Sequence, residues 1–329
     1  MHPLLNDARD IRVQQYGGQV TAKSLAAVDQ LVLILPERSD SAVWAGLPQG
    51  SKLQAAAKKN PAGSVPALTS RLSNKRQTLV IGGTLAAGAD AFEQLSVARK
   101  LIAAATNEKA GCLGICVHGF DANTQAEISA NALSAALAAG FTMPAYKSES
   151  ESAAIRSIRL LGLADKLNIE RVRAEADGNN LARWLTTMPP NKLDAHNYTD
   201  IVRSLAKENN WQYKRYSAKE LEKLGAGAFL AVAQGNENDS ACIIRLRHRP
   251  GSTKAKAKNT KADISLVGKG IIFDTGGTNL KPFTSMLDMH IDMGGSAVAL
   301  GTMQALTELE VPFGIDCWLA ITENRTGPD

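Results

Sequence analysis

Short apolar segments alternate with helix-like segments along the first half of the chain, and this alternation limits the folds that the sequence can adopt. Three segments are rich in β-branched or apolar residues and end in turn residues: "QLVLILPE" (30–37), "TLVIGG" (78–83) and "GCLGICVHGF" (111–120). Each has the length and composition of a buried strand. Helix-like sequence lies between and after them, as in layered α/β domains with a largely parallel sheet.

The helix-like segments have their own start and stop signals. In "DAFEQLSVARKLIAAATNE" (90–108), apolar residues recur at helical spacing from Phe92 onward. A second helix is predicted to begin at Thr124, whose hydroxyl caps the first turn while Glu127 reaches back, and to end at Gly140.

A second α/β pattern follows a change in composition near residue 150. At 329 residues the chain exceeds one ordinary core and suits two. A Ser- and Glu-rich stretch leads into long charged helical sequence, so we predict domains at 1–148 and 149–329 joined by a long helix. The fold class expected is α/β, with a largely parallel or mixed sheet and flanking helices in each domain. The elements expected beyond the prolines of "MPPNKLD" are a helix at 195–208 capped by Asp194, a short helix capped by Ser217, strands at 242–249, 263–269 and 313–322, and a helix at 296–309.

The composition indicates the class of protein and limits the partners expected for it. Hydrophobic residues make up 44% of the chain, which is typical of globular proteins. No apolar run approaches the roughly 18 residues of a membrane span, and the start lacks a secretory signal, so we expect a cytoplasmic protein without a membrane partner. The four cysteines lie in apolar strand-like runs and are expected to be buried, reduced thiols.

The net charge of +5 is a mild excess, much of it in "RLRHRPGSTKAKAKNTKAD" (245–263). We expect this stretch to be a solvated surface loop between two strands. A nucleic-acid-binding patch is the alternative that stays open.

The segment "VGKGIIFDTGGTNLKP" (267–282) contains most of the candidate functional residues. It is not a P-loop, because no glycine lies five residues before Lys269 and no Ser or Thr follows it. A strand that enters a glycine-rich turn delivers its residues to the carboxyl edge of a sheet, where Lys269 and Asp274 are expected. Asp292 precedes an alanine-rich helix, so it either caps that helix or, if it converges with Asp274, shares a divalent cation with it.

This segment, followed by "MHIDMGGSAVALG" (289–301), resembles the metal-site signature of the leucyl aminopeptidase family of cytosolic metallo-exopeptidases. The resemblance covers residues 180–329 and extends to the first half by architecture alone. It implies that Lys269, Asp274 and Asp292 are metal ligands, with Lys269 acting as a neutral amine, and that Lys281 is a catalytic cation that polarises the scissile carbonyl.

The resemblance also implies the cofactors and partners. They are two divalent ions, zinc or manganese, a bicarbonate general base in the intact protein, peptides with a free amino terminus, and further copies of the chain in a hexamer. The first domain would then serve assembly or control access to the site.

One family motif, Asn-Thr-Asp-Ala-Glu-Gly-Arg, does not occur in the sequence, which ends at "AITENRTGPD". We therefore expect a piece of a longer protein that by itself binds metal poorly and hydrolyses little. The alternative function is a catalytically silent family member that acts as a binding or architectural protein and contacts DNA.

Two further sets of residues have open interpretations. His290 is either a zinc ligand or an ordinary histidine, and His118 is expected to be a satisfied core or surface histidine. Met286, Met289, Met293 and Met303 either line a pocket for an apolar amino-terminal side chain or pack in the core.

Overall fold

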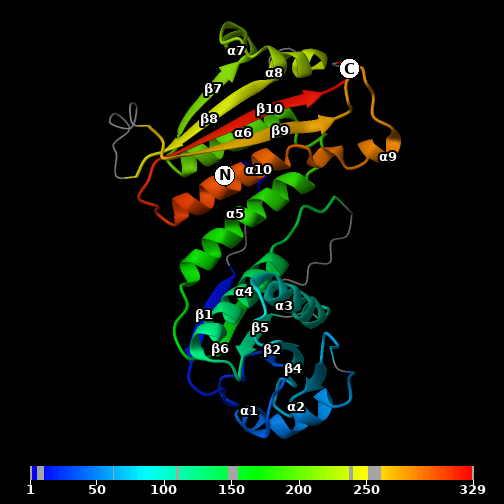
Figure 1. The fold of residues 1–329 in the computed structure, drawn as a ribbon, viewed down its shortest axis with the longest axis vertical. Helices are drawn as coiled ribbons and strands as arrows, with labels where there is room; N and C mark the ends of the chain where they lie inside the picture. The colour runs from blue at the N-terminus through cyan, green and yellow to red at the C-terminus, as the bar shows by residue number, and fades with distance from the viewer. Residues whose placement is uncertain are drawn as a thin grey trace. The chain divides into compact units, whose positions relative to one another are not determined.

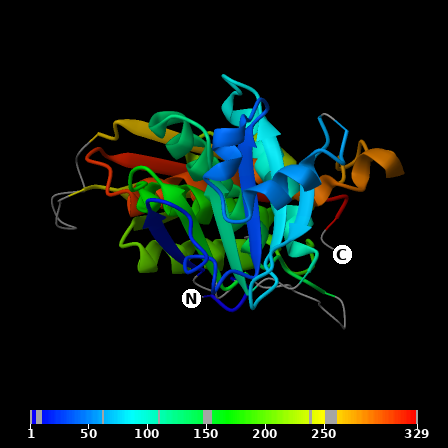
Figure 2. The ribbon, with the colours of Figure 1, turned by 90° about the horizontal axis from the view of Figure 1, so that it is seen from below.

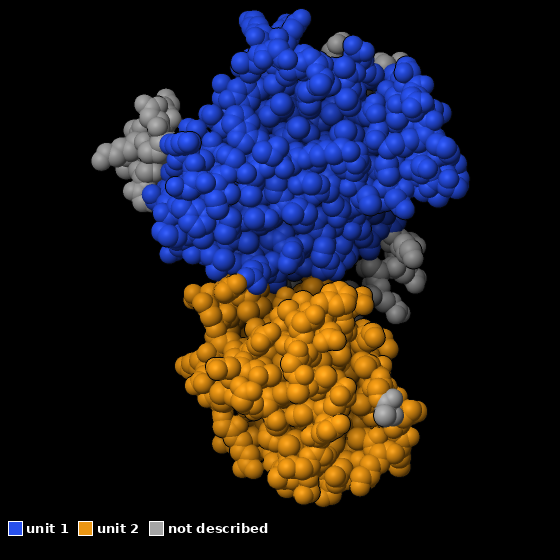
Figure 3. Space-filling model, in the orientation of Figure 1, with its two compact units in different colours: residues 1–7, 143–146, 174–329 blue, residues 8–142, 147–173 orange. Residues whose placement is uncertain are grey.

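The computed structural model describes residues 2–5, 11–61, 63–108, 111–146, 155–236, 240–250 and 261–327. The chain divides into two compact units, shown in Figure 3. Unit 1 comprises residues 1–7, 143–146 and 174–329, and unit 2 comprises residues 8–142 and 147–173. The predicted boundary at 148/149 lies outside the described residues, and the units divide instead within helix α5 (Ile169–Thr187).

Unit 2 is built on a six-stranded sheet in the order β1-β6-β5-β2-β4-β3, which the two ribbon views show (Figure 1, Figure 2). All neighbouring strands are parallel except β3 and β4. The largely parallel α/β layer predicted for the first half is therefore present. The strands are β1 (Arg12–Gly17), β2 (Gln30–Pro36), β3 (Leu68–Arg71), β4 (Leu79–Leu85), β5 (Cys112–Val117) and β6 (Ser157–Leu163), and the helices are α1 (Ser41–Ala45), α2 (Gly50–Ala57), α3 (Ala91–Thr106) and α4 (Ala122–Gly140).

Three local predictions for this unit were wrong. Helix α4 begins at Ala122, because Asp121 rather than Thr124 accepts the first free N–H groups. Phe92, counted on the apolar face of α3, is 78% exposed. Strand β6 was read as part of the long helix, but it pairs with β1 and β5, so that helix begins only at Ile169.

Unit 1 contains a mixed four-stranded sheet in the order β7-β8-β10-β9 (Figure 1). β9 and β10 are parallel, whereas β8 is antiparallel to both β7 and β10. The strands are β7 (Gln212–Ser217), β8 (Cys242–His248), β9 (Ile264–Asp274) and β10 (Ile315–Asn324). The helices besides α5 are α6 (Ala195–Glu208), α7 (Ala218–Lys223), α8 (Gly227–Val232), η1 (Ala233–Gly235), α9 (Phe283–Met286), η3 (Met289–Ile291) and α10 (Gly294–Glu308).

Helices α6 and α10 cover one face of this sheet. Tyr198 and Ile201 of α6 and Leu300 of α10 are fully buried against Ile244 and Leu319 of the strands. Helix α6 has the bounds predicted from its Asp194 cap, which accepts a hydrogen bond from the N–H of Asn197. Burial of this apolar face, rather than helix propensity, supplies most of the stability of the layer.

All four cysteines are buried free thiols, as predicted. Burial raises the pKa of Cys116 to about 12, and burial together with the charge of Asp316 raises the pKa of Cys317 to about 12. Because the thiolate is the reactive form, we expect Ellman's reagent at about pH 8 to label none of them in the folded protein. All four should react after unfolding in guanidinium. A thiol of the folded protein that reacts as fast as in the unfolded chain would contradict this burial.

Candidate metal centre

Two lysine–carboxylate pairs lie around β9 and the start of α10: Lys269 with Asp292, and Lys281 with Asp274, here together called the β9 site. Lys269 lies within β9, and Asp274 is its last residue. Lys281 lies in the following turn, and Asp292 lies between η3 and α10. Residues 23 positions apart therefore meet because the chain returns to β9 through η3.

Glycines permit this return. A Cβ on Gly268 of β9 would lie 2.4 Å from the Cα of Ser296, so the first turn of α10 packs directly on the strand. In the turn after β9, Gly276 has a φ of +89°, which side chains disfavour. The glycine-rich sequence thus brings backbone close to backbone around the charged residues.

Each carboxylate of the β9 site is paired with one lysine. The ammonium of Lys269 donates to Oδ1 of Asp292 over 2.7 Å, and that of Lys281 donates to Oδ2 of Asp274 over 2.5 Å. The Lys269 side chain is 57% exposed, whereas the Asp274 side chain is only 15% exposed. Each carboxylate therefore forms an ion pair with a lysine of the same chain.

Asp274 is held on both oxygens. Its Oδ1 accepts hydrogen bonds from the N–H of Gly276 over 3.0 Å and from the amide of Asn324 over 2.6 Å. Partial burial opposes ionisation of this carboxyl, but the hydrogen bonds from Lys281, Asn324 and Gly276 outweigh it and lower its pKa below the usual value. Asp274 is thus an oriented carboxylate whose ionised form is favoured.

Asp292 does not cap α10. The N-cap of that helix is Met293, whose side chain makes no capping hydrogen bond. Oδ2 of Asp292 is instead buried and has no hydrogen-bond partner among the residues that the structure describes. A buried carboxylate oxygen without a donor is costly unless a cation or another group contacts it.

The neighbouring side chains have simpler roles. No hydrogen bond joins His290 to either carboxylate, both of which lie in the described part of the chain. The Lys281 ammonium also lies 2.8 Å from Sδ of Met289. Met293 and Met303 are fully buried in the core, so the pocket interpretation fails for these two. His118 is satisfied, as expected, by a contact of 3.1 Å between Nε2 and the carbonyl of Val43.

The residues of the β9 site fit a divalent cation in part. Two carboxylates supply the oxygen donors, one of them with an unpartnered oxygen, and Lys269 would supply an amine nitrogen after losing its proton. Within the described residues, no group of three or more His, Cys, Asp or Glu side chains forms a fuller ligand set.

Comparison with known proteins relates part of the chain to a family. The model of the cytosol aminopeptidase family, catalytic domain, matches residues 180–329. This matched segment belongs to the cytosol aminopeptidase family. The β9 site lies entirely within it, and the resemblance drawn from the motifs is confirmed.

Curated relatives share this assignment. The chain is 40% identical over 186 residues to a protein of Stutzerimonas stutzeri named probable cytosol aminopeptidase, in a match that covers 54% of this chain and 36% of the relative. It is 35% identical over 217 residues to the cytosol aminopeptidase of Pseudomonas aeruginosa, with 64% of this chain and 42% of the relative covered. The chain therefore spans less than half the length of these relatives.

Solved structures extend the likeness of fold to nearly the whole chain. A tomato leucine aminopeptidase mutant matches with a TM-score of 0.75 at 21% identity, covering 97% of this chain and 64% of that one. Leucyl aminopeptidase from Trypanosoma brucei in complex with actinonin matches with a TM-score of 0.74 at 21% identity, with coverages of 95% and 62%. The bottromycin maturation enzyme BotP in complex with Mn matches with a TM-score of 0.70 at 21% identity, with coverages of 92% and 60%. At these identities the likeness establishes the aminopeptidase fold.

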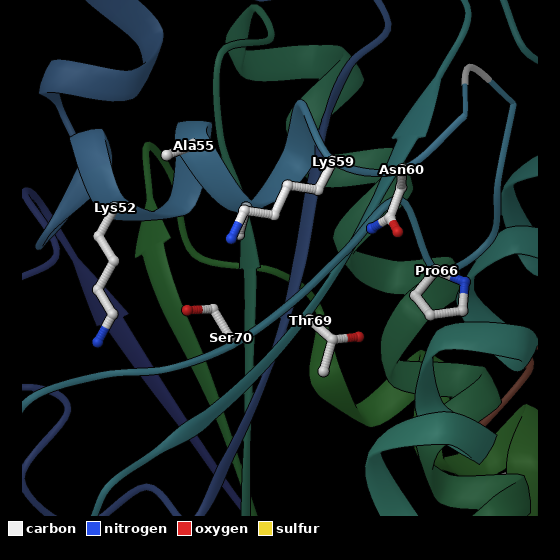
Figure 4. Close-up of a pocket in the computed structure, with 8 residues that line it drawn as sticks. Lys52, Ala55, Lys59, Asn60, Pro66, Thr69 and Ser70 are labelled. Atoms are coloured by element: carbon white, nitrogen blue, oxygen red, sulfur yellow. The ribbon is translucent and has the colours of Figure 1, made fainter.

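Two surface hollows of unit 2 are lined by residues that the structure describes. One, of about 460 Å³, lies between α2 and β3, where Lys52 extends from the helix and Lys59 from the turn after it, and where Thr69 and Ser70 come from the strand on the other side (Figure 4). The Lys52 ammonium is already engaged, because it donates to the carbonyl of Arg71 over 2.6 Å. The second, of about 610 Å³, lies where β2, β4 and β5 end.

Asn324 is the contact of the β9 site that sequence reasoning missed. Motif comparison placed it only in a stretch upstream of a family motif. Its role depends on the pairing of β10 with β9, in which Asn324 is opposite Asp274. Only the register between two strands about 50 residues apart could have indicated this contact, and no local sequence pattern contains that register.

Proposed function

We propose that the protein containing this chain is a metal-dependent aminopeptidase that releases amino-terminal residues from peptides. The observation that carries the proposal is the β9 site itself. The proposal is supported by two lysine–carboxylate pairs within the segment that matches the family and by Oδ2 of Asp292, which is buried without a hydrogen-bond donor among the described residues.

Lys269, Asp274 and Asp292 are the proposed metal ligands. Lys269 already reaches Asp292 from β9, so both side chains approach one point from different elements. An amine ligates only after it loses its proton, which neighbouring divalent cations favour strongly. Two bound divalent ions, zinc or manganese, would supply Lewis-acid polarisation and lower the pKa of a water molecule.

Lys281 is the proposed catalytic cation. Its side chain is 27% exposed, and its ammonium is held by Asp274 at the end of β9. A positioned ammonium stabilises the negative charge that develops on a carbonyl oxygen during attack. The two lysines would therefore have different roles. Lys269 would bind metal as a neutral amine, and Lys281 would keep its proton.

The proposed substrates, assembly, further cofactor and location rest on the family resemblance alone. We propose peptides with a free amino terminus as substrates, a homohexamer as the assembly, bicarbonate as a further cofactor of the intact protein and the cytoplasm as its location. Residues 1–148 would then serve assembly or access. Among the described residues, no helix combines the length and hydropathy needed to cross a bilayer.

No observation favours the DNA-contacting alternative. Lys254, Lys256 and Lys258, which would carry it, lie outside the described residues. Arg247 and Arg249 of the same stretch both donate to Asp316.

Hydrolysis of leucine amide by the protein expressed from its complete gene tests the proposal. We expect release of leucine that requires Mn²⁺ or Zn²⁺, stops with a chelator and does not occur when the substrate amino group is acetylated. Asp274→Ala should abolish the reaction, because it removes the oriented carboxylate. Asp200→Ala, at an exposed pair on α6, is the matched control and should react as the wild type does. Hydrolysis that persists in Asp274→Ala would overturn the proposed function.

A further inference from the structure

We propose that Asn324 is a positioning residue that fixes the carboxylate of Asp274 for metal binding. The inference rests on the proposed function and goes beyond its ligand set. The amide nitrogen of Asn324 donates to Oδ1 of Asp274 over 2.6 Å, from the last residue of β10 to the last residue of β9.

The two strands bring these residues together by their register. β9 and β10 pair in parallel from Ile264 and Ile315 onward, and after a local irregularity the pairing ends with Asn324 opposite Asp274. Parallel strands end at the same edge of a sheet, where ligands bind. The contact is therefore a product of the sheet rather than of a mobile loop.

The two carboxylate oxygens of Asp274 have different hydrogen-bond donors. Oδ1 accepts two N–H groups, from Gly276 and Asn324, which together occupy its lone pairs. Oδ2 accepts only the ammonium of Lys281. Asn324 thereby turns Oδ2 toward the cationic side of the site.

An amide suits this task better than a cationic side chain would. A lysine or arginine in the same place would neutralise the carboxylate and compete with a metal ion for it. The amide is neutral, so it orients Asp274 without adding a second positive charge to the one that Lys281 already supplies. Hydrogen bonds of this kind to ligating carboxylates tune metal affinity in other metal sites.

Asn324 is itself held in place. Its carbonyl accepts hydrogen bonds from the N–H of Thr275 over 3.0 Å and from the Thr275 hydroxyl over 2.7 Å. A Cβ on Gly277 would lie 2.8 Å from Oδ1 of Asn324, so the absent side chain leaves room for the amide oxygen. The opposite amide orientation would set this oxygen against the Asp274 carboxylate, which fixes the nitrogen as the donor.

Mn²⁺ binding measures the effect in the protein expressed from its complete gene. Asn324→Ala removes the donor, and Asn324→Leu removes it while keeping the volume. Both should weaken Mn²⁺ binding about 10- to 100-fold, measured by electron paramagnetic resonance of the free ion. Both should also shift the visible absorption of bound Co²⁺, a signature of ligand geometry that a loss of stability alone does not produce. Asn209→Ala is the control, because it removes one amide hydrogen bond, to Leu205, at the end of α6.

Two outcomes separate this inference from the proposed function. If Asp274→Ala binds Mn²⁺ as tightly as the wild type, the metal site itself is wrong and the role of Asn324 falls with it. If Asp274→Ala loses Mn²⁺ while both Asn324 variants match Asn209→Ala in affinity and in Co²⁺ absorption, the proposed function stands and the positioning role is overturned.

Discussion

Gly301→Ala is expected to destabilise unit 1 by about 3 kcal/mol, although alanine is the better helix former. Helices α5 and α10 touch through their backbones at Gly178 and Gly301. A Cβ on Gly301 would lie 2.3 Å from the carbonyl oxygen of Gly178, and a Cβ on Gly178 would lie 2.4 Å from that of Gly301. Backbone atoms cannot move aside as a flexible side chain would. The clash therefore outweighs the roughly 1 kcal/mol that alanine gains over glycine within a helix.

Urea denaturation of the purified protein measures this cost. Gly227→Ala is the matched control, because Gly227 also lies in a helix and a Cβ there would meet no atom within 4 Å. The control should be neutral or slightly more stable. A Gly301→Ala protein as stable as Gly227→Ala would show that the two helices do not approach as described.

Asp316→Ala is expected to lose about 3–5 kcal/mol. Asp316 lies on β10 directly opposite Arg247 of β8, with only 8% of its side chain exposed. It accepts hydrogen bonds from Arg247 over 3.1 Å and from Arg249 over 2.7 Å, and only 6% of the Arg249 side chain is exposed. Removal of the carboxylate leaves two largely buried guanidinium charges without this counter-charge.

Asp200→Ala provides the comparison for this pair. Asp200 bonds to Arg203 over 2.9 Å on α6, but both side chains are more than half exposed, at 52% and 58%. Exposed pairs of this kind contribute about 0.3–0.5 kcal/mol. Equal free energies of unfolding for the two variants would contradict the buried network.

Elements with strong local signals were predictable from the sequence. Helix α6 has its predicted bounds because Asp194 caps it and its apolar residues recur at helical spacing. Strand β10 was predictable from its run of apolar residues, and helix α7 from its capping box at Ser217. In each case a few neighbouring residues determine the element.

Elements that depend on distant partners were not predictable. Strand β6 lies in sequence that was predicted to be helical from its charged composition, and only its pairing with β1 and β5 makes it a strand. The β9 site shows the same limit. The sequence placed both Lys269 and Asp274 at the carboxyl edge of the sheet, but only Asp274 ends β9. Lys269 lies in the middle of that strand, and its contact with Asp292 depends on the packing of α10 on β9.

Anomalous diffraction from crystals of the protein grown with Mn²⁺ tests the central claim most directly. The β9 site predicts an anomalous peak roughly 2.0–2.2 Å from carboxylate oxygens of Asp274 and Asp292, with Nζ of Lys269 turned toward it. Saturating Mn²⁺ with no peak there, and with the lysines still paired to the two carboxylates, would contradict the assignment of this site as a metal centre.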